Sequence, residues 1–201
     1  MIIHPETQTV KDTYKLLMGS IVPRPIAFVS TVSADGIPNL APFSFFTGIT
    51  SQPPTVGFAP SRKGSAGDRK DTLANIEATG EFVVNVVTLE IVEPMNATAV
   101  DFPPEVNEFT EVGLTPIPSD RVSAPRVAES PINMECKLHQ IVPVGVKGPG
   151  GGFFVIGEVV AFHVADDLFN EGRIDVERLN PVGRLAGKAY TTLGKSFILE
   201  R

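Results

Sequence analysis

The sequence has very few of the residues that form disulfides and metal sites. Its 201 residues include one cysteine, no tryptophan and three histidines. A single cysteine cannot form an intramolecular disulfide, so folding does not require an oxidising compartment. His4, His139 and His163 are isolated and form no Cys/His cluster with metal-ligand spacing. We therefore expect no metal site.

Positive charge and long apolar runs are also scarce. The formal net charge is -6, and the 17 lysines and arginines are scattered, whereas a nucleic-acid site needs a basic patch. No run approaches the roughly 20 apolar residues of a membrane span, and residues 1–5 do not resemble a signal peptide. We expect one domain, 1–201, in a cytoplasmic protein with neither a nucleic-acid nor a membrane partner.

Several catalytic motifs are missing as well. The sequence has no G-x-S-x-G nucleophile elbow, no Walker loop and no G-x-G-x-x-G after a strand. The glycine-rich segment 147–152 is not followed by a helical pattern, so it is interpreted as a hairpin tip. These absences leave no catalytic residue to assign.

Short β-branched and aromatic runs separated by Gly, Pro, Asn and Ser predict an all-β barrel or sandwich. Asp35-Gly36 is a strong hairpin signal because glycine accepts positive φ. The predicted strands are 26–32, 37–47, 55–59, 81–87, 132–143 and 153–164. The predicted helices are 10–18, 72–79 and 90–99, the second with Asp71 as N-cap and Gly80 as stop. The Pro-rich, acidic stretch 101–130 is expected to pack on the barrel.

The segment 70–76 is the first candidate for a ligand-binding site in the sequence. Lys70 and Thr72 at a helix start offer a charge, a hydroxyl and backbone N–H groups to one anion. An ordinary capped helix with a solvated lysine is the alternative. Upstream, residues 61–65 add further donors. The pattern is compatible with a phosphate site without requiring one.

The segment 39–47 is the second candidate. Pro42 suggests a strand edge with an interrupted ladder, which leaves the Ser44 and Thr47 hydroxyls for a ligand. Phe45 and Phe46 fall on opposite faces of a strand, so one can line a pocket while the other fills the core. Taken alone, the segment favours core packing as the explanation for both aromatics.

Cys136 and His163 are interpreted mainly as structural residues. Residues 132, 134, 136 and 138 are apolar and alternate with polar residues, which places Cys136 on the buried face as an inert thiol. His163 ends the 153–164 run and is equally compatible with a structural or a catalytic role.

The chain as a whole resembles the flavin reductase-like family of FMN-binding split-barrel proteins, which includes flavoredoxin-like members. The resemblance spans nearly the full length with the blocks in family order. The matching blocks are 22–31, 39–46, 70–76, 129–131 followed by 135–136, 156–160 and 183–190. It implies a mainly β fold, a six-stranded Greek-key split β-barrel with a few short peripheral helices.

The resemblance also implies a homodimer with FMN bound at the dimer edge. It puts the FMN phosphate near Ser61, Lys70 and Thr72, and the rest of the flavin along 41–47, with weaker candidates elsewhere. The cofactor-binding residues are Arg24, Asn39, Ala41, Pro42, Ser44, Phe45, Phe46, Thr47, Ser61, Lys70, Thr72 and Tyr190. A dimer would also cover an open sheet edge. We expect the apolar runs 28–29 and 82–84 to form that edge.

The implied activity is that of an oxidoreductase. In an NAD(P)H-dependent flavin reductase, NADH or NADPH passes a hydride to FMN, and the protein supplies position and electrostatics. The alternative is a flavoredoxin-like FMN electron carrier that a partner protein reduces. A third, less favoured, is a barrel that has lost its flavin. The sequence does not distinguish NADH from NADPH or identify an electron-acceptor protein.

Overall fold

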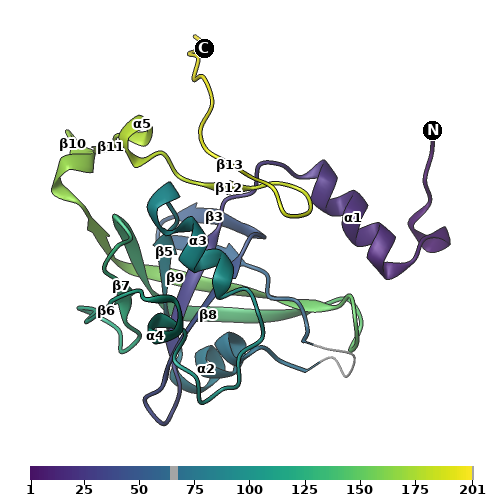
Figure 1. Cartoon of the computed structure of the whole chain (residues 1–201), viewed down its shortest axis with the longest axis horizontal. Coiled ribbons are helices and arrows are strands. Elements are labelled where there is room, and N and C mark those ends of the chain that lie inside the picture. The colour runs from purple at the N-terminus through teal and green to yellow at the C-terminus, as the bar shows by residue number, and fades with distance from the viewer. Residues whose placement is uncertain (64–67, 201) are drawn as a thin grey trace.

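A seven-stranded antiparallel sheet forms the body of the protein (Figure 1). The computed structural model describes residues 1–63 and 68–200. The strand order is β2-β1-β5-β8-β9-β4-β3. The strands are β1 (Ala27–Val32), β2 (Pro38–Phe43), β3 (Phe46–Ser51), β4 (Pro54–Phe58), β5 (Glu81–Val86), β8 (Ile132–Val144) and β9 (Gly152–Val164). The fold is therefore mainly β, as predicted.

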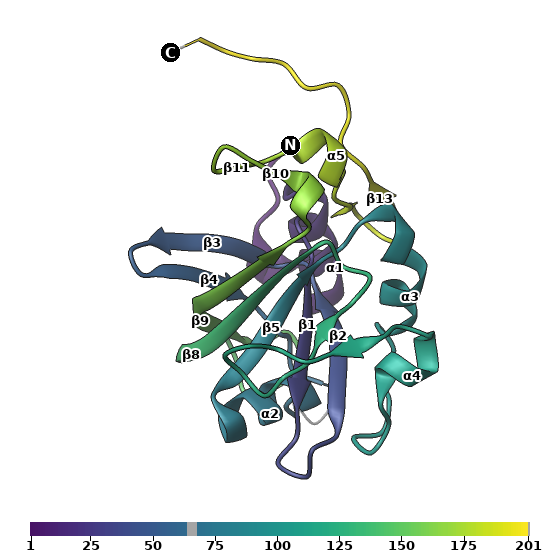
Figure 2. The same cartoon turned by 90° about the vertical axis from the view of Figure 1, so that its left-hand side faces the viewer.

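The sheet has one strand more than the six predicted because the expected strand 37–47 divides in two. Its first part forms β2 and its last residues begin β3, with Ser44 and Phe45 in a bend between them. β2 and β3 are the two edges of the sheet, and Figure 2 shows them diverging. Pro42 lies in an edge strand, as predicted, where a residue without an N–H is tolerated.

Alternating side chains form two apolar clusters, one on each face of the sheet. In β1, Ala27 and Val29 belong to the cluster that the helix at 71–79 covers, whereas Phe28 belongs to the other. The prediction that runs 28–29 and 82–84 form an apolar sheet edge is wrong. They lie in the interior strands β1 and β5, and each of these residues is fully buried.

The longest hairpin joins β8 and β9 through the glycine-rich loop, which confirms that prediction. The register shifts between Glu135 and Cys136 and again between Leu138 and Gln140, and such bulges increase the local twist. Gly157 of β9 lies against the ring of Phe82, and a Cβ at this position would overlap that ring.

Short helices lie around the sheet, three of them close to predicted ranges. They are α1 (Val10–Ser20), α2 (Asp71–Thr79), α3 (Val92–Ala97), α4 (Glu108–Val112), α5 (Val176–Leu179) and the 3-10 turns η1 (Pro5–Thr7), η2 (Leu89–Ile91) and η3 (Asp166–Leu168). α2 stops at Gly80, whose φ of 71° forms a left-handed cap as predicted. Its N-cap is Lys70 instead of Asp71, and Asp71 is the first helical residue.

The stretch 101–130 packs on the outside of the sheet, as predicted, and buried polar side chains hold it there. Glu135 accepts hydrogen bonds from the amides of Asp120 (2.8 Å) and Arg121 (2.6 Å). The Asn85 side chain accepts one from the amide of Val127 (3.0 Å). The predicted polar face of β8 is therefore covered, and Glu135 is fully buried.

The described residues also form three small two-stranded sheets. They are β6 (Pro116–Ile117) with β7 (Arg126–Val127), β10 (Phe169–Asn170) with β11 (Arg173–Ile174), and β12 (Gly183–Arg184) with β13 (Tyr190–Thr191). After β13 the C-terminal segment runs away from the sheet (Figure 2). Among the described residues, no helix is long and apolar enough to cross a membrane.

Candidate functional site

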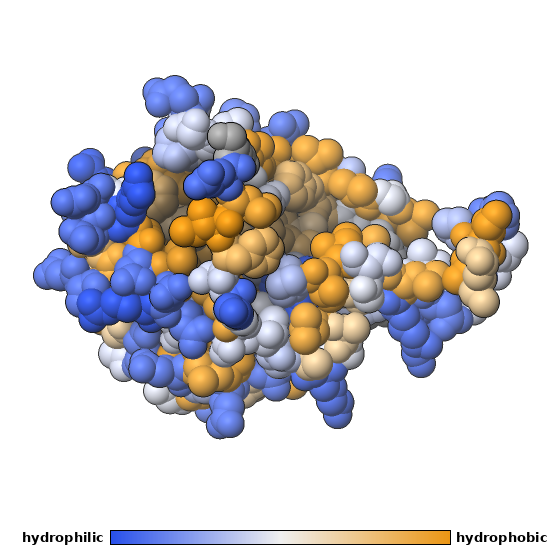
Figure 3. Space-filling view, turned by 90° about the horizontal axis from the view of Figure 1, so that it is seen from above, coloured by the Kyte–Doolittle hydropathy of each residue, from blue (hydrophilic) through white to orange (hydrophobic). Residues whose placement is uncertain are grey.

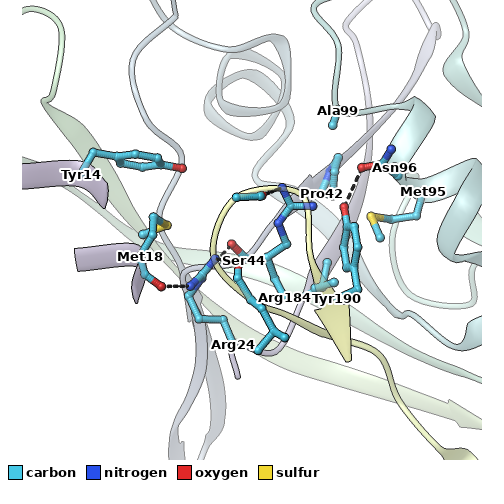
Figure 4. A pocket seen from close by; sticks show the side chains of 13 residues that line it. Tyr14, Met18, Arg24, Pro42, Ser44, Met95, Asn96, Ala99, Arg184 and Tyr190 are labelled. Atoms are coloured by element: carbon cyan, nitrogen blue, oxygen red, sulfur yellow. Dashed lines mark hydrogen bonds between the residues drawn. The ribbon is translucent and has the colours of Figure 1, made fainter. Parts of the chain in front are cut away.

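A cavity of about 280 Å³ lies between α1, the end of β2, α3 and the β12–β13 hairpin (Figure 4). Two arginines line it, Arg24 and Arg184, and we call it the arginine pocket. Four of the predicted site residues line it, namely Arg24, Pro42, Ser44 and Tyr190. The structure thus brings together residues from the two ends of the chain and from β2.

Arg24 is a buried connector in the wall of this pocket, with 3% of its surface exposed. Its Nε donates to the Ser44 hydroxyl at 3.2 Å, and its Nη1 donates to the carbonyls of Met18 and Ile21 at 2.8 Å each. Its Nη2 donates to the Leu185 carbonyl at 3.0 Å. Burial lowers the pKa of the guanidinium below its usual value. Arg24 therefore orients the Ser44 hydroxyl and connects the end of α1 to Leu185, in the turn between β12 and β13.

Arg184 and Tyr190 form the opposite wall. They face each other across the β12–β13 ladder, and the Arg184 guanidinium lies 4.3 Å from the centre of the Tyr190 ring. The Tyr190 hydroxyl donates to the Asn96 side-chain oxygen at 2.7 Å (Figure 4). Sequence reasoning missed Arg184 and Asn96. Arg184 lies in the same matching block as Tyr190, and its charge was a signal there.

A second, smaller cavity of about 60 Å³ adjoins the arginine pocket, since Pro42 and Ala99 line both. It lies between β2, the start of α2 and residues 98–108, and we call it the lysine pocket. The predicted site residues that line it are Asn39, Ala41, Pro42, Lys70 and Thr72. Eight of the twelve predicted residues therefore lie along two adjoining cavities.

The polar groups of the lysine pocket are already paired with one another. The Lys70 Nζ lies 3.1 Å from the Asp101 carboxylate. Thr72 is 1% exposed, and its hydroxyl donates to the Asn39 side-chain oxygen at 2.7 Å. Lys70 is half-buried and its partner is exposed, so an anion can exchange with Asp101 more easily than with the buried Thr72–Asn39 pair.

Glu108 closes the floor of the lysine pocket and was not predicted. It is 5% exposed and accepts hydrogen bonds from the Asn39 side-chain amide (2.7 Å) and from the amide of Leu40 (3.1 Å). Burial raises the pKa of its carboxyl above the usual value, against the effect of these hydrogen bonds. Nothing in the stretch 101–130 marked this glutamate in the sequence.

The other four predicted residues lie outside both cavities. Phe46 packs against the core and lines a separate apolar cavity of about 280 Å³. Phe45 is half-buried in the bend, and Thr47 is exposed in β3. Ser61 is exposed and forms a bridge with Gly152. The neighbouring donors at 64–65 lie outside the described residues.

Cys136 and His163 take structural positions. Cys136 is fully buried in the core, as predicted, and burial raises the pKa of its thiol well above the usual value. His163 lies 2.5 Å from the buried carboxylate of Glu135, which also binds the 120–121 amides. His163 therefore belongs to the attachment of the stretch 101–130, on a different part of the sheet from the two pockets.

Known proteins of similar sequence or structure span nearly the whole chain. An uncharacterised protein of Halalkalibacterium halodurans is 46% identical over 100% of this chain and 96% of its own length. Nitrilotriacetate monooxygenase component B from Bacillus cereus is 45% identical with a TM-score of 0.95, covering 99% and 98% of the two chains. Pseudomonas fluorescens 2-nitrobenzoate 2-nitroreductase is 33% identical with a TM-score of 0.88, covering 100% and 96%.

A more distant structure, flavoredoxin of Desulfovibrio vulgaris, shares the fold at 22% identity with a TM-score of 0.76 over 99% and 97% of the two chains. The family model described as "Flavin reductase like domain" matches residues 18–180. That range includes both cavities except for Tyr14, Arg184, Leu185, Gly187 and Tyr190. The match confirms the resemblance seen in the sequence: this chain belongs to the flavin reductase-like family.

Proposed function

We propose that the protein binds FMN along β2 and catalyses the NAD(P)H-dependent reduction of flavin. One observation carries the proposal. In a chain of the flavin reductase-like family, two adjoining cavities share Pro42 at the open edge of the sheet. The similar proteins named above as a monooxygenase component and a nitroreductase support an oxidoreductase function.

The lysine pocket has the donors that a phosphate monoester needs. Lys70 supplies one positive charge at the start of α2, and the first amides of a helix have no intrahelical partner. The carboxylates of Asp71 and Asp101 line the same cavity and oppose an anion. The residues fit a phosphate provided that Lys70 exchanges its exposed partner Asp101 for it.

The edge strand fits the rest of a flavin. β2 pairs on one side only, with β1. On its other side the Leu40 amide already donates to Glu108 and Pro42 has no N–H, so carbonyl oxygens and side chains are the groups left there for the polar edge of a ring system. Ser44 follows directly, and Arg24 orients its hydroxyl. Together, Ala41, Pro42 and Ser44 would hold the ring between the two cavities.

When bound, FMN supplies a centre that accepts a hydride and passes electrons on. The protein's own residues bind the flavin, orient its ring and exclude water from it. Arg24 fixes the wall that carries Ser44, and Glu108 with Asn39 fixes the backbone of β2. None of these roles requires a protein acid or base, in keeping with the absence of a catalytic constellation in the sequence.

We propose further that the protein is a cytoplasmic homodimer. Exposed apolar side chains lie on α1, where Tyr14 and Leu17 are 56% and 46% exposed, and on the C-terminal segment, where Phe197 is 80% exposed. Figure 3 shows apolar side chains around a hollow on the upper face. A second copy would cover such surfaces and the open edge at β2. The single, buried cysteine suits a reducing compartment.

The proposal is tested by mixing the purified protein with free FMN and either NADH or NADPH and following the nicotinamide absorbance band. We expect protein-dependent oxidation of the nicotinamide. FMN binding without such oxidation would refute the reductase and favour the alternative, an electron carrier that a partner protein reduces. No FMN binding would refute the flavin site itself.

A further inference from the structure

The arginine pocket carries positive charge without a matching negative charge. Arg24 and Arg184 line it, and among the described residues no aspartate or glutamate does. Their backbones pair with each other, with N–O distances of 2.9 and 2.8 Å. In a chain of net charge -6, two adjacent guanidinium groups facing one cavity mark a site for an anion.

The two arginines differ in what they can still bind. Arg24 is buried and spends its donors on neutral oxygens, three carbonyls and a hydroxyl. Arg184 is half-buried and donates from Nη2 to the Gly187 carbonyl. A guanidinium has five N–H donors in a planar fork, so Arg184 retains the capacity for a bidentate contact with a phosphate.

Aromatic rings accompany this charge. The Tyr190 ring stacks with Arg184 and is anchored through its hydroxyl to Asn96. Tyr14 of α1 lines the cavity from the other side (Figure 4). A cation beside two aromatic rings suits a ligand with both phosphate groups and planar rings.

The lysine pocket has the opposite balance. One lysine meets three carboxyl groups there, from Asp71, Asp101 and Glu108. The lysine pocket can hold one phosphate monoester if this phosphate replaces Asp101 as the partner of Lys70. Among the described residues, no further cation lines it for a second phosphate-bearing ligand. Since the two cavities share Pro42 and Ala99, a ligand in the arginine pocket lies beside one on β2.

We propose that Arg184 and Tyr190 form the subsite that binds the phosphate groups of the nicotinamide dinucleotide. This inference rests on the proposed function and assigns a specificity-determining residue to it. Arg184 holds the anionic part of the second substrate, while Lys70 holds the phosphate of FMN. The two sites are separable, because their cations come from different elements, β12 and the start of α2.

The test uses the FMN-loaded protein and NADP+, which cannot reduce the flavin, as the probe in equilibrium titrations followed by calorimetry. Arg184→Gln removes the charge and the fork. Loss of a charge-assisted contact predicts about a ten- to hundredfold rise in the dissociation constant for NADP+. Arg184→Lys keeps the charge without the planar fork, so its dissociation constant for NADP+ is expected to lie between those of the wild type and Arg184→Gln. The dissociation constant for FMN stays within about twofold in both variants.

Arg178→Gln is the matched control, since Arg178 pairs with Asp167 on the surface of α5. It loses the same charge and is expected to bind NADP+ like the wild type. Two results would overturn the subsite: NADP+ affinity unchanged in Arg184→Gln, or FMN affinity lost in place of NADP+ affinity, which would put the flavin phosphate here. A wild type that binds FMN but not NADP+ also overturns it, whereas a wild type that does not bind FMN refutes the proposed function.

Discussion

Lys70→Ala is expected to weaken FMN binding selectively through the phosphate. The ammonium now lies 3.1 Å from the Asp101 carboxylate, and the two side chains are 31% and 53% exposed. A charge-assisted contact to a phosphate is worth about 1.5–3 kcal/mol. Its loss raises the dissociation constant for FMN roughly ten- to a hundredfold.

Asp101→Asn is the matched variant, and it is expected to change the FMN affinity in the opposite direction. Exposed ion pairs contribute about 0.2–1 kcal/mol, and binding must break this one before Lys70 can reach the phosphate. Removing the competing carboxylate therefore strengthens FMN binding by about 1.4- to 5-fold, which is that same energy expressed as an affinity ratio. The two variants separate a lysine that binds phosphate from one that merely pairs with Asp101.

The assay is quenching of flavin fluorescence on titration with protein, with riboflavin as the control ligand. Riboflavin lacks the phosphate, so it should bind more weakly than FMN. Its dissociation constant should be unchanged in Lys70→Ala. An unchanged FMN affinity in Lys70→Ala would refute the phosphate assignment and leave Lys70 a surface residue. Equal effects of the substitution on the two flavins would show a general change in the site instead.

Three further outcomes are expected. Cys136→Ala leaves FMN affinity unchanged but lowers the free energy of unfolding by about 1 kcal/mol, measured by urea denaturation; lost activity with unchanged stability would make the thiol a redox participant. Glu135→Gln is expected to destabilise the protein by about 1–3 kcal/mol at neutral pH, because a buried amide loses its acceptor. Burial opposes ionisation of Glu135, but the 120 and 121 amides and His163 hold its pKa below the usual value, so this stability is present above about pH 4.3 and is lost as pH falls through the folded-state pKa. The gap between wild type and variant should narrow in acid, and a gap independent of pH would contradict the assignment. Light scattering should give about twice the mass of one chain, with dilution releasing FMN; a monomer that retains FMN would refute the shared site.

Most of the sheet could be predicted from the sequence because its strands are bounded by strong local signals. Pro42 correctly indicated an edge, and Gly80 correctly indicated a helix stop. The extra strand was missed because residues 43–47 contain no Gly, Pro, Asn or Asp to signal a turn. In the structure a bend at Ser44 and Phe45 divides the run 37–47 into two strands that lie at opposite edges of the sheet.

The site was less accessible to sequence reasoning because its charges are paired across long separations. Asp101 and Glu108 contact Lys70 and Asn39 from a stretch without any recognisable motif. Thr72 appeared to be a ligand donor, yet its hydroxyl serves Asn39. Arg184 acquires its meaning only beside Arg24, 160 positions earlier, through a backbone bridge that no local pattern encodes.

The strand order also constrains how the chain can fold. The pairs β1–β2, β3–β4 and β8–β9 are hairpins between consecutive strands, whose loops close at little entropic cost. By contrast, β4 pairs with β9 about a hundred residues away in the chain, and contacts at such separation slow folding. The three hairpins can thus form early and independently, whereas the β4–β9 contact can form only after β9 has been synthesised. During translation, the β4 side of the β3–β4 hairpin stays unpaired until nearly four-fifths of the chain has been synthesised, and an unpaired strand edge of this kind is exposed to aggregation for that time.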